Sequence, residues 1–163
     1  MFKKIFSLAI LLSAIIFSTA AAAPNYRAPC PTYLDAEKNY ILFADLKIHG
    51  AGLYVDRKSV KVIQEDEGGC LISIDEVQVP DANLGKTEIT NRFNHIYSYV
   101  YDKNLVMRFI AEEDKWVRVN PDITNPEDDH FTYDARIAEM AYYLAYGKKF
   151  YGTFDEDFYN ILK

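Results

Sequence analysis

The chain has few of the residues on which common catalytic and metal-binding motifs depend. It holds two cysteines, three histidines and one tryptophan among 163 residues. The cysteines are not in CxxC spacing, so neither a redox-active nor a zinc-binding pair is predicted. The histidines are too far apart for HxH or HExxH motifs, and GxSxG, Walker and GxGxxG signatures are absent. The sequence therefore predicts no catalytic residue, no cofactor and no metal site, and enzyme activity has no support.

Long apolar runs are also scarce, and the one present lies at the start of the chain. Two lysines precede an apolar stretch over residues 5–17, and small residues follow it. This order is typical of a secretory signal, and the stretch is shorter than the roughly 20 residues that cross a bilayer. Because proline fits poorly after a cleavage site, Pro24 favours cleavage after Ala22. We expect residues 1–22 to be a signal peptide, no membrane span after it, and a periplasmic, secreted or cell-surface location.

Basic residues are outnumbered, which disfavours one class of partner. The formal net charge is −6, and without residues 1–22, which hold two lysines and no acid, it becomes −8. An exported chain this acidic is a poor candidate for nucleic-acid binding. Export also favours oxidation of the two thiols, so we expect Cys30 and Cys70 to form one structural disulfide.

Turn residues divide the remaining chain into an N-terminal arm and one domain. Residues 23–38 contain three prolines and predict an irregular arm, whereas residues 39–163 begin with short β-rich runs separated by turns. One helix is predicted over residues 134–151, with an apolar stripe at Ile137, Met140, Ala141 and Leu144. Strands followed by a helix, without βαβ alternation, indicate an α+β fold, here an antiparallel meander of about five to seven strands with a C-terminal helix packed on one face. The predicted strands cover residues 39–48, 53–55, 59–64, 70–79, 87–101, 104–111 and 115–119.

The turn around residues 102–104 decides which side chains share a sheet face. A three-residue loop places Tyr97 on the same face as Met107 and Phe109, and this apolar face could receive the helix. An even-numbered loop would instead place Tyr97 beside Arg108. Amphipathicity favours the three-residue loop. The opposite face then collects the candidate binding residues Arg92, Arg108, Trp116 and Arg118.

This predicted face has the composition of an interaction surface, because arginine and tryptophan are enriched at binding hot spots. It would suit an acidic extracellular or envelope protein, or an anionic glycan. A second copy of the chain is an alternative partner, which would make a homodimer. An ordinary solvated sheet surface, with its arginines paired to acids across strands, is the remaining interpretation.

Two segments resemble a group of small exported bacterial proteins. Residues 53–60 (LYVDRKSV) are similar to a YVD-x-x-S-[IV] element of that group, and residues 138–146 (AEMAYYLAY) are similar to its closing segment. The surface-adhesin protein E family is the named group that the chain most resembles. The resemblance implies an antiparallel sheet with a C-terminal helix, and binding of host extracellular proteins such as vitronectin and laminin. The sequence thus indicates an exported, non-enzymatic binding module; a structural or assembly subunit and a small periplasmic enzyme or inhibitor are the alternatives.

Overall fold

The computed structural model describes residues 28–47, 49–121 and 129–163, with side chains from residue 133 onward in the last stretch. The predicted signal peptide, residues 1–22, lies outside the described residues. Within the described ranges, no helix is both long enough and apolar enough to cross a membrane.

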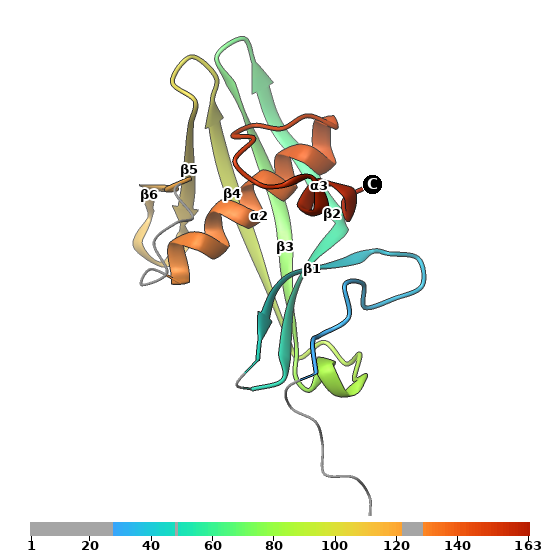
Figure 1. Ribbon diagram of the computed structural model, residues 1–163. Coiled ribbons are helices and arrows are strands. Elements are labelled where there is room, and N and C mark those ends of the chain that lie inside the picture. The colour runs from blue at the N-terminus through green and yellow to red at the C-terminus, as the bar shows by residue number, and fades with distance from the viewer. Residues whose placement is uncertain (1–27, 48, 122–128) are drawn as a thin grey trace, which may run out of the picture.

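Six antiparallel strands form one sheet, and each strand pairs with the next along the chain (Figure 1). A long helix, α2 (Asp129–Tyr146), crosses one face of the sheet, and a short helix, α3 (Glu156–Asn160), lies near the C-terminus. The predicted α+β meander with a C-terminal helix on one face is therefore confirmed. The strands are β1 (Tyr40–Leu46), β2 (Ala51–Asp66), β3 (Gly69–Val79), β4 (Asn91–Val100), β5 (Leu105–Ile110) and β6 (Lys115–Arg118), with single 3₁₀ turns η1 (Ala82–Leu84) and η2 (Ala111–Glu113).

Strand β2 joins two segments that the sequence analysis separates with a turn. Its pairing with β3 shifts register between Asp56 and Lys61, which marks a β-bulge rather than a chain reversal. Side chains satisfy the backbone there. The Ser59 hydroxyl donates to the Asp56 carbonyl at 2.6 Å and accepts from the Asp75 amide at 2.7 Å. The polar residues at this point therefore bend the strand without ending it.

The main core lies between α2 and one face of the sheet, called here the helix face. Three residues of the predicted helix stripe, Ile137, Met140 and Ala141, are at most 1% exposed. Burial of a side chain of this size stabilises the fold by about 1.5–3 kcal/mol relative to full exposure. The Tyr99 hydroxyl donates to the Ala138 carbonyl at 2.7 Å, which adds a polar contact between sheet and helix. Strand residues in this core include Ile41, Val55, Ile72, Ile74, Tyr97, Tyr99 and Val106.

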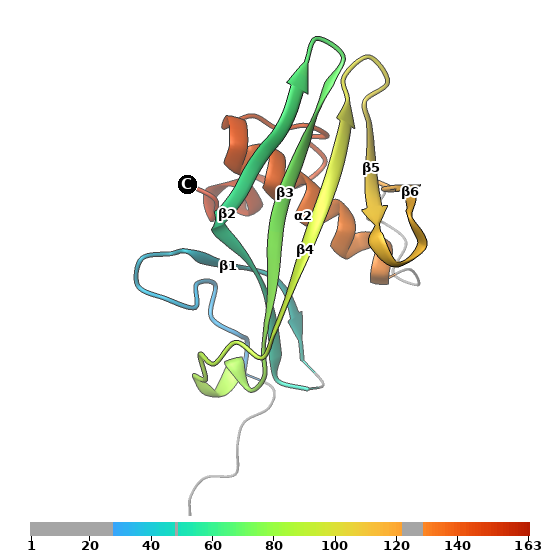
Figure 2. The ribbon, with the colours of Figure 1, turned by 180° about the vertical axis from the view of Figure 1, so that it is seen from behind.

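A smaller core covers one end of the opposite face, called here the outer face. It contains Cys30, Tyr54, Val77, Val79 and Ala82, so the arm and η1 both contribute to it. The Tyr54 hydroxyl donates to the carbonyl of Pro31 at 3.1 Å. Figure 2 shows that no described segment lies over the outer face of β2, β3 and β4 toward their other end.

The predicted Cys30–Cys70 disulfide is wrong, because both thiols are free and they lie in different cores. Cys30 contacts Asp45 and Gly50 near the β1–β2 turn. Cys70 lies near the start of β3. Val79, nine residues later on the same strand, pairs with Gly52 beside the β1–β2 turn. Nine strand residues span about 30 Å, whereas a disulfide needs Cα atoms within about 7 Å.

Candidate functional site

The β4–β5 hairpin has a different register from the predicted one. Tyr97 pairs with Arg108, and Val100 pairs with Leu105, so four residues, 101–104, connect the strands. The connection is even-numbered, and the predicted three-residue loop is wrong. Because side chains alternate along a strand, Arg108 therefore shares the helix face with Tyr97.

The backbone of Tyr101 explains the extra loop residue. Its amide donates to the carbonyl of Gly68 in the β2–β3 turn at 3.0 Å. Tyr101 therefore extends the contact between β4 and the β2–β3 hairpin and does not pair with β5. Asn104 then reverses the chain at a positive φ of 46°, a conformation that asparagine tolerates. A contact with a distant turn thus decides the register.

The four predicted binding residues do not form one surface. Arg108 points to the helix face, whereas Arg92, Trp116 and Arg118 lie on the outer face. Trp116 is 42% exposed and packs beside Phe109, with ring centroids 5.2 Å apart. A binding role for the three outer-face residues stays a prediction.

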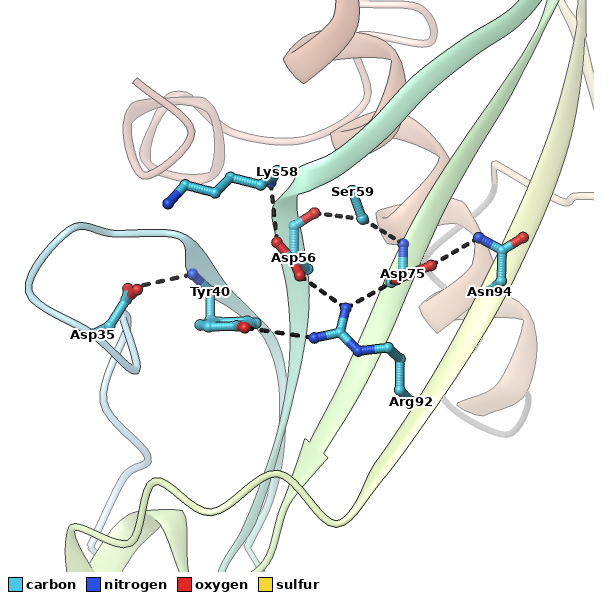
Figure 3. Close-up of polar contacts among 8 residues, drawn as sticks. All are labelled: Asp35, Tyr40, Asp56, Lys58, Ser59, Asp75, Arg92 and Asn94. Atoms are coloured by element: carbon cyan, nitrogen blue, oxygen red, sulfur yellow. Dashed lines mark hydrogen bonds and ion pairs between the residues drawn. The ribbon is translucent and has the colours of Figure 1, made fainter.

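The guanidinium of Arg92 is occupied by acids from two other strands, as Figure 3 shows. It lies 2.8 Å from the Asp56 carboxylate and 2.9 Å from the Asp75 carboxylate. These two hydrogen bonds raise the pKa of Arg92 above its ordinary value. Asn94 also donates to Asp75 at 2.7 Å, and Arg92 reaches the Tyr40 hydroxyl at 3.5 Å. The network braces β1 to β4 at the bulge and leaves this arginine less available to a partner.

The helix face contains a cleft beside the N-terminal half of α2, with a volume of about 820 Å³. Residues from β1 to β5, η2 and α2 line it. Phe93, at the β4 side of the cleft, is half exposed. The apolar part of the lining includes Phe43, Leu46, Leu53, Ile110 and Ile137.

Two polar pairs lie in this mainly apolar cleft, and His95 and Glu76 form the first. Their side chains come from neighbouring strands, and Nε2 of His95 lies 2.9 Å from the Glu76 carboxylate. The side chains are only 7% and 15% exposed. When the neutral ring donates from Nε2 to Glu76, Nδ1 is left as an acceptor. The pair therefore fixes the ring orientation next to an open volume.

Arg108 and Asp134 form the second pair, which joins β5 to α2 at 2.6 Å. Burial alone would lower the pKa of Arg108, but its hydrogen bond and attraction to Asp134 outweigh burial and raise it. Asp134 therefore offsets much of the positive charge that Arg108 brings to the cleft.

Tyr97 is fully buried behind the two pairs. Burial, and next the negative charge of Asp134, raise the pKa of Tyr97 well above its ordinary value. No described residue forms a hydrogen bond of good geometry with its hydroxyl oxygen.

Sequence reasoning missed His95, Glu76 and Asp134 as members of one site. A signal for His95 was present, since Phe93, His95 and Tyr97 alternate along one strand and place a histidine among aromatic residues. The partners could not be found in the same way, because they come from β3 and α2. In the part of the chain that the structure describes, no three His, Cys, Asp or Glu side chains are grouped to hold a metal ion.

Comparison with known proteins adds no relative from which a role could be transferred. No family model, no curated protein and no solved structure matches the chain. The resemblance to the surface-adhesin protein E family therefore stays a prediction.

Proposed function

We propose that the chain is an exported, non-enzymatic binding module that holds a small amphipathic molecule in the cleft between α2 and the sheet. The observation that carries the proposal is the pairing of His95 with Glu76, and of Arg108 with Asp134, inside a mainly apolar cleft. Small-molecule sites commonly have volumes of about 300–1,000 Å³, apolar walls and a few convergent polar groups. The cleft has all three properties. Export follows from the signal predicted in residues 1–22.

Binding can be tested with the neutral fluorescent probe N-phenyl-1-naphthylamine and the chain lacking residues 1–22. We expect saturable probe fluorescence, because the probe gains intensity in an apolar site. Leu46→Trp would fill part of the cleft, since Leu46 lines it and is half-buried. Leu84→Trp is the matched control, since Leu84 is exposed on η1 and does not line the cleft.

The proposal expects Leu46→Trp to weaken probe binding about tenfold or more while Leu84→Trp binds like the wild type, a difference of about 1.4 kcal/mol. Absence of saturable binding, or equal binding by both variants, would contradict it. Circular dichroism spectra would show whether each variant is folded.

A second candidate function is proton-transfer catalysis, which the orientation of His95 by Glu76 favours. Mass spectrometry of a bound compound recovered after incubation separates the two functions. A binding module returns the compound unchanged. An enzyme returns a product, and His95→Gln would abolish its formation.

A further inference from the structure

We infer that the molecule held in the cleft carries a positively charged group, such as an ammonium, on an apolar body. This inference rests on the proposed binding function and specifies its ligand class. The fold brings more acidic than basic side chains to the cleft among the described residues.

Acidic side chains exceed the cations available to them. Glu76, Glu112 and Asp134 line the cleft, together with Arg92 and Arg108. Asp134 neutralises Arg108, so that arginine leaves little charge for an anionic ligand.

Arg92 contributes still less positive charge, because its guanidinium lies on the outer face, where it contacts two further carboxylates, those of Asp56 and Asp75. Glu112 has no ion-pair partner among the described residues, and the Glu76 carboxylate pairs with the imidazole of His95 and is also attracted by Arg108. Three carboxylates therefore face one guanidinium and one imidazole, so acidic groups outnumber basic ones among the described residues that serve the cleft.

The surroundings strengthen the effect of this excess. Apolar walls lower the local dielectric constant, and clefts lined by one sign of charge concentrate ions of the opposite sign. The rings of Phe43 and Tyr133 also line the cleft and pack edge to face, with centroids 6.2 Å apart. Aromatic faces attract cations, whereas a bound carboxylate would meet Glu76 and Glu112 beside an Arg108 that already pairs with Asp134.

Three competitors with the same eight-carbon body and different head groups test the inference. Octylammonium, octanol and octanoate would each displace N-phenyl-1-naphthylamine from the chain lacking residues 1–22. We expect octylammonium to compete at least about tenfold more strongly than octanoate, with octanol between them. The difference should shrink at 0.5 M salt, because added ions screen the charges.

Single substitutions test whether the preference for octylammonium over octanoate arises in the cleft. Glu76→Gln removes a charge but retains an amide that can contact His95, and Glu112→Gln changes an exposed residue whose loss should not affect folding. Each should lower the ratio of octylammonium binding to octanol binding about three- to tenfold, because each removes one negative charge from the cleft. Glu67→Gln is the matched control, because it removes the same charge from the exposed β2–β3 turn.

The outcomes distinguish the two levels of the proposal. Equal binding of the three competitors, stronger binding of octanoate, or the same loss in Glu67→Gln as in Glu76→Gln and Glu112→Gln would overturn the charge inference and leave the binding function intact. Failure of both the neutral probe and octanol to bind would overturn the binding function itself.

Discussion

Replacement of Glu139 by glutamine should destabilise the protein strongly, because this carboxylate is buried and organises the C-terminal segment. Glu139 is 0% exposed and lies in the middle of α2. It accepts hydrogen bonds from the amides of Phe150, Tyr151 and Gly152 at 3.0, 2.9 and 3.3 Å. The hydroxyl of Tyr159 donates a fourth at 2.7 Å. Three consecutive amides pointing at one carboxylate form an anion-binding arrangement, here filled by a side chain of the same chain.

The cost can be worked out from these four contacts. A glutamine placed with its oxygen at the Oε1 position keeps the contacts to Phe150, Gly152 and Tyr159 but turns its amide group toward the Tyr151 amide. One charge-assisted hydrogen bond, worth about 1.5–3 kcal/mol, is lost, and a buried donor is left unsatisfied at about 1–3 kcal/mol. We therefore expect Glu139→Gln to lower the free energy of unfolding by about 3 kcal/mol.

Urea unfolding followed by circular dichroism would measure this loss. With a slope of about 1.5 kcal/mol per molar urea, the midpoint should fall by about 2 M. Glu156→Gln is the control, since Glu156 pairs with Lys149 at the surface nearby and its midpoint should not change measurably. Hydrogen exchange should also show lower protection of amides 150–152. A loss below about 1 kcal/mol with unchanged protection would refute this account of Glu139.

Four further predictions rest on other contacts. Gly69→Ala should cost more than about 2 kcal/mol, because a Cβ there would lie 2.0 Å from the Tyr99 carbonyl oxygen, whereas Gly68→Ala should be tolerated; equal melting temperatures would contradict this. The denatured, unreduced protein should show two free thiols with Ellman's reagent. Fewer than two would indicate that Cys30 and Cys70 form a disulfide after all. Burial, and next Asp45, raise the pKa of Cys30 to about 11, so its alkylation in the folded protein should accelerate only as the pH approaches that value. Arg92→Met should lower the free energy of unfolding by about 1 kcal/mol, because Asp56 and Asp75 lose their shared cation while solvent screens part of the attraction to this half-exposed arginine. No measurable loss in urea unfolding would contradict this.

Periodicity in the sequence was sufficient to predict most of the elements. The predicted strand 70–79 corresponds to β3 (Gly69–Val79), because its alternation reflects burial on one face. The predicted helix, 134–151, corresponds to α2 (Asp129–Tyr146), but its end was placed too late. Gly147 adopts a positive φ of 66° and its amide donates to the Tyr143 carbonyl at 2.7 Å, which ends the helix.

The role of Glu139 could not be predicted in the same way. Its partners are backbone amides 11 to 13 residues later and a hydroxyl 20 residues later. Amides have no sequence signature, so a glutamate within a helix gives no indication that a later segment folds onto it. Hydrophobic periodicity does not predict contacts between a helix and a later segment that folds back against it.

The hairpin register shows why the candidate site was also missed. Amphipathic patterning predicts the register that gives the helix face only apolar residues, and this rule holds for an ordinary core. The fold instead directs Arg108 to the helix face, where Asp134 of α2 neutralises it, and leaves Met107 and Phe109 on the outer face. Because Asp134 stabilises Arg108 on the helix face, the polar and apolar side chains of β5 lie on the opposite faces from those predicted. Local rules commonly fail at sites that serve a function. The failure of the patterning rule at Arg108, in the same cleft as His95 and Glu76, thus supports the cleft as the place where this protein acts.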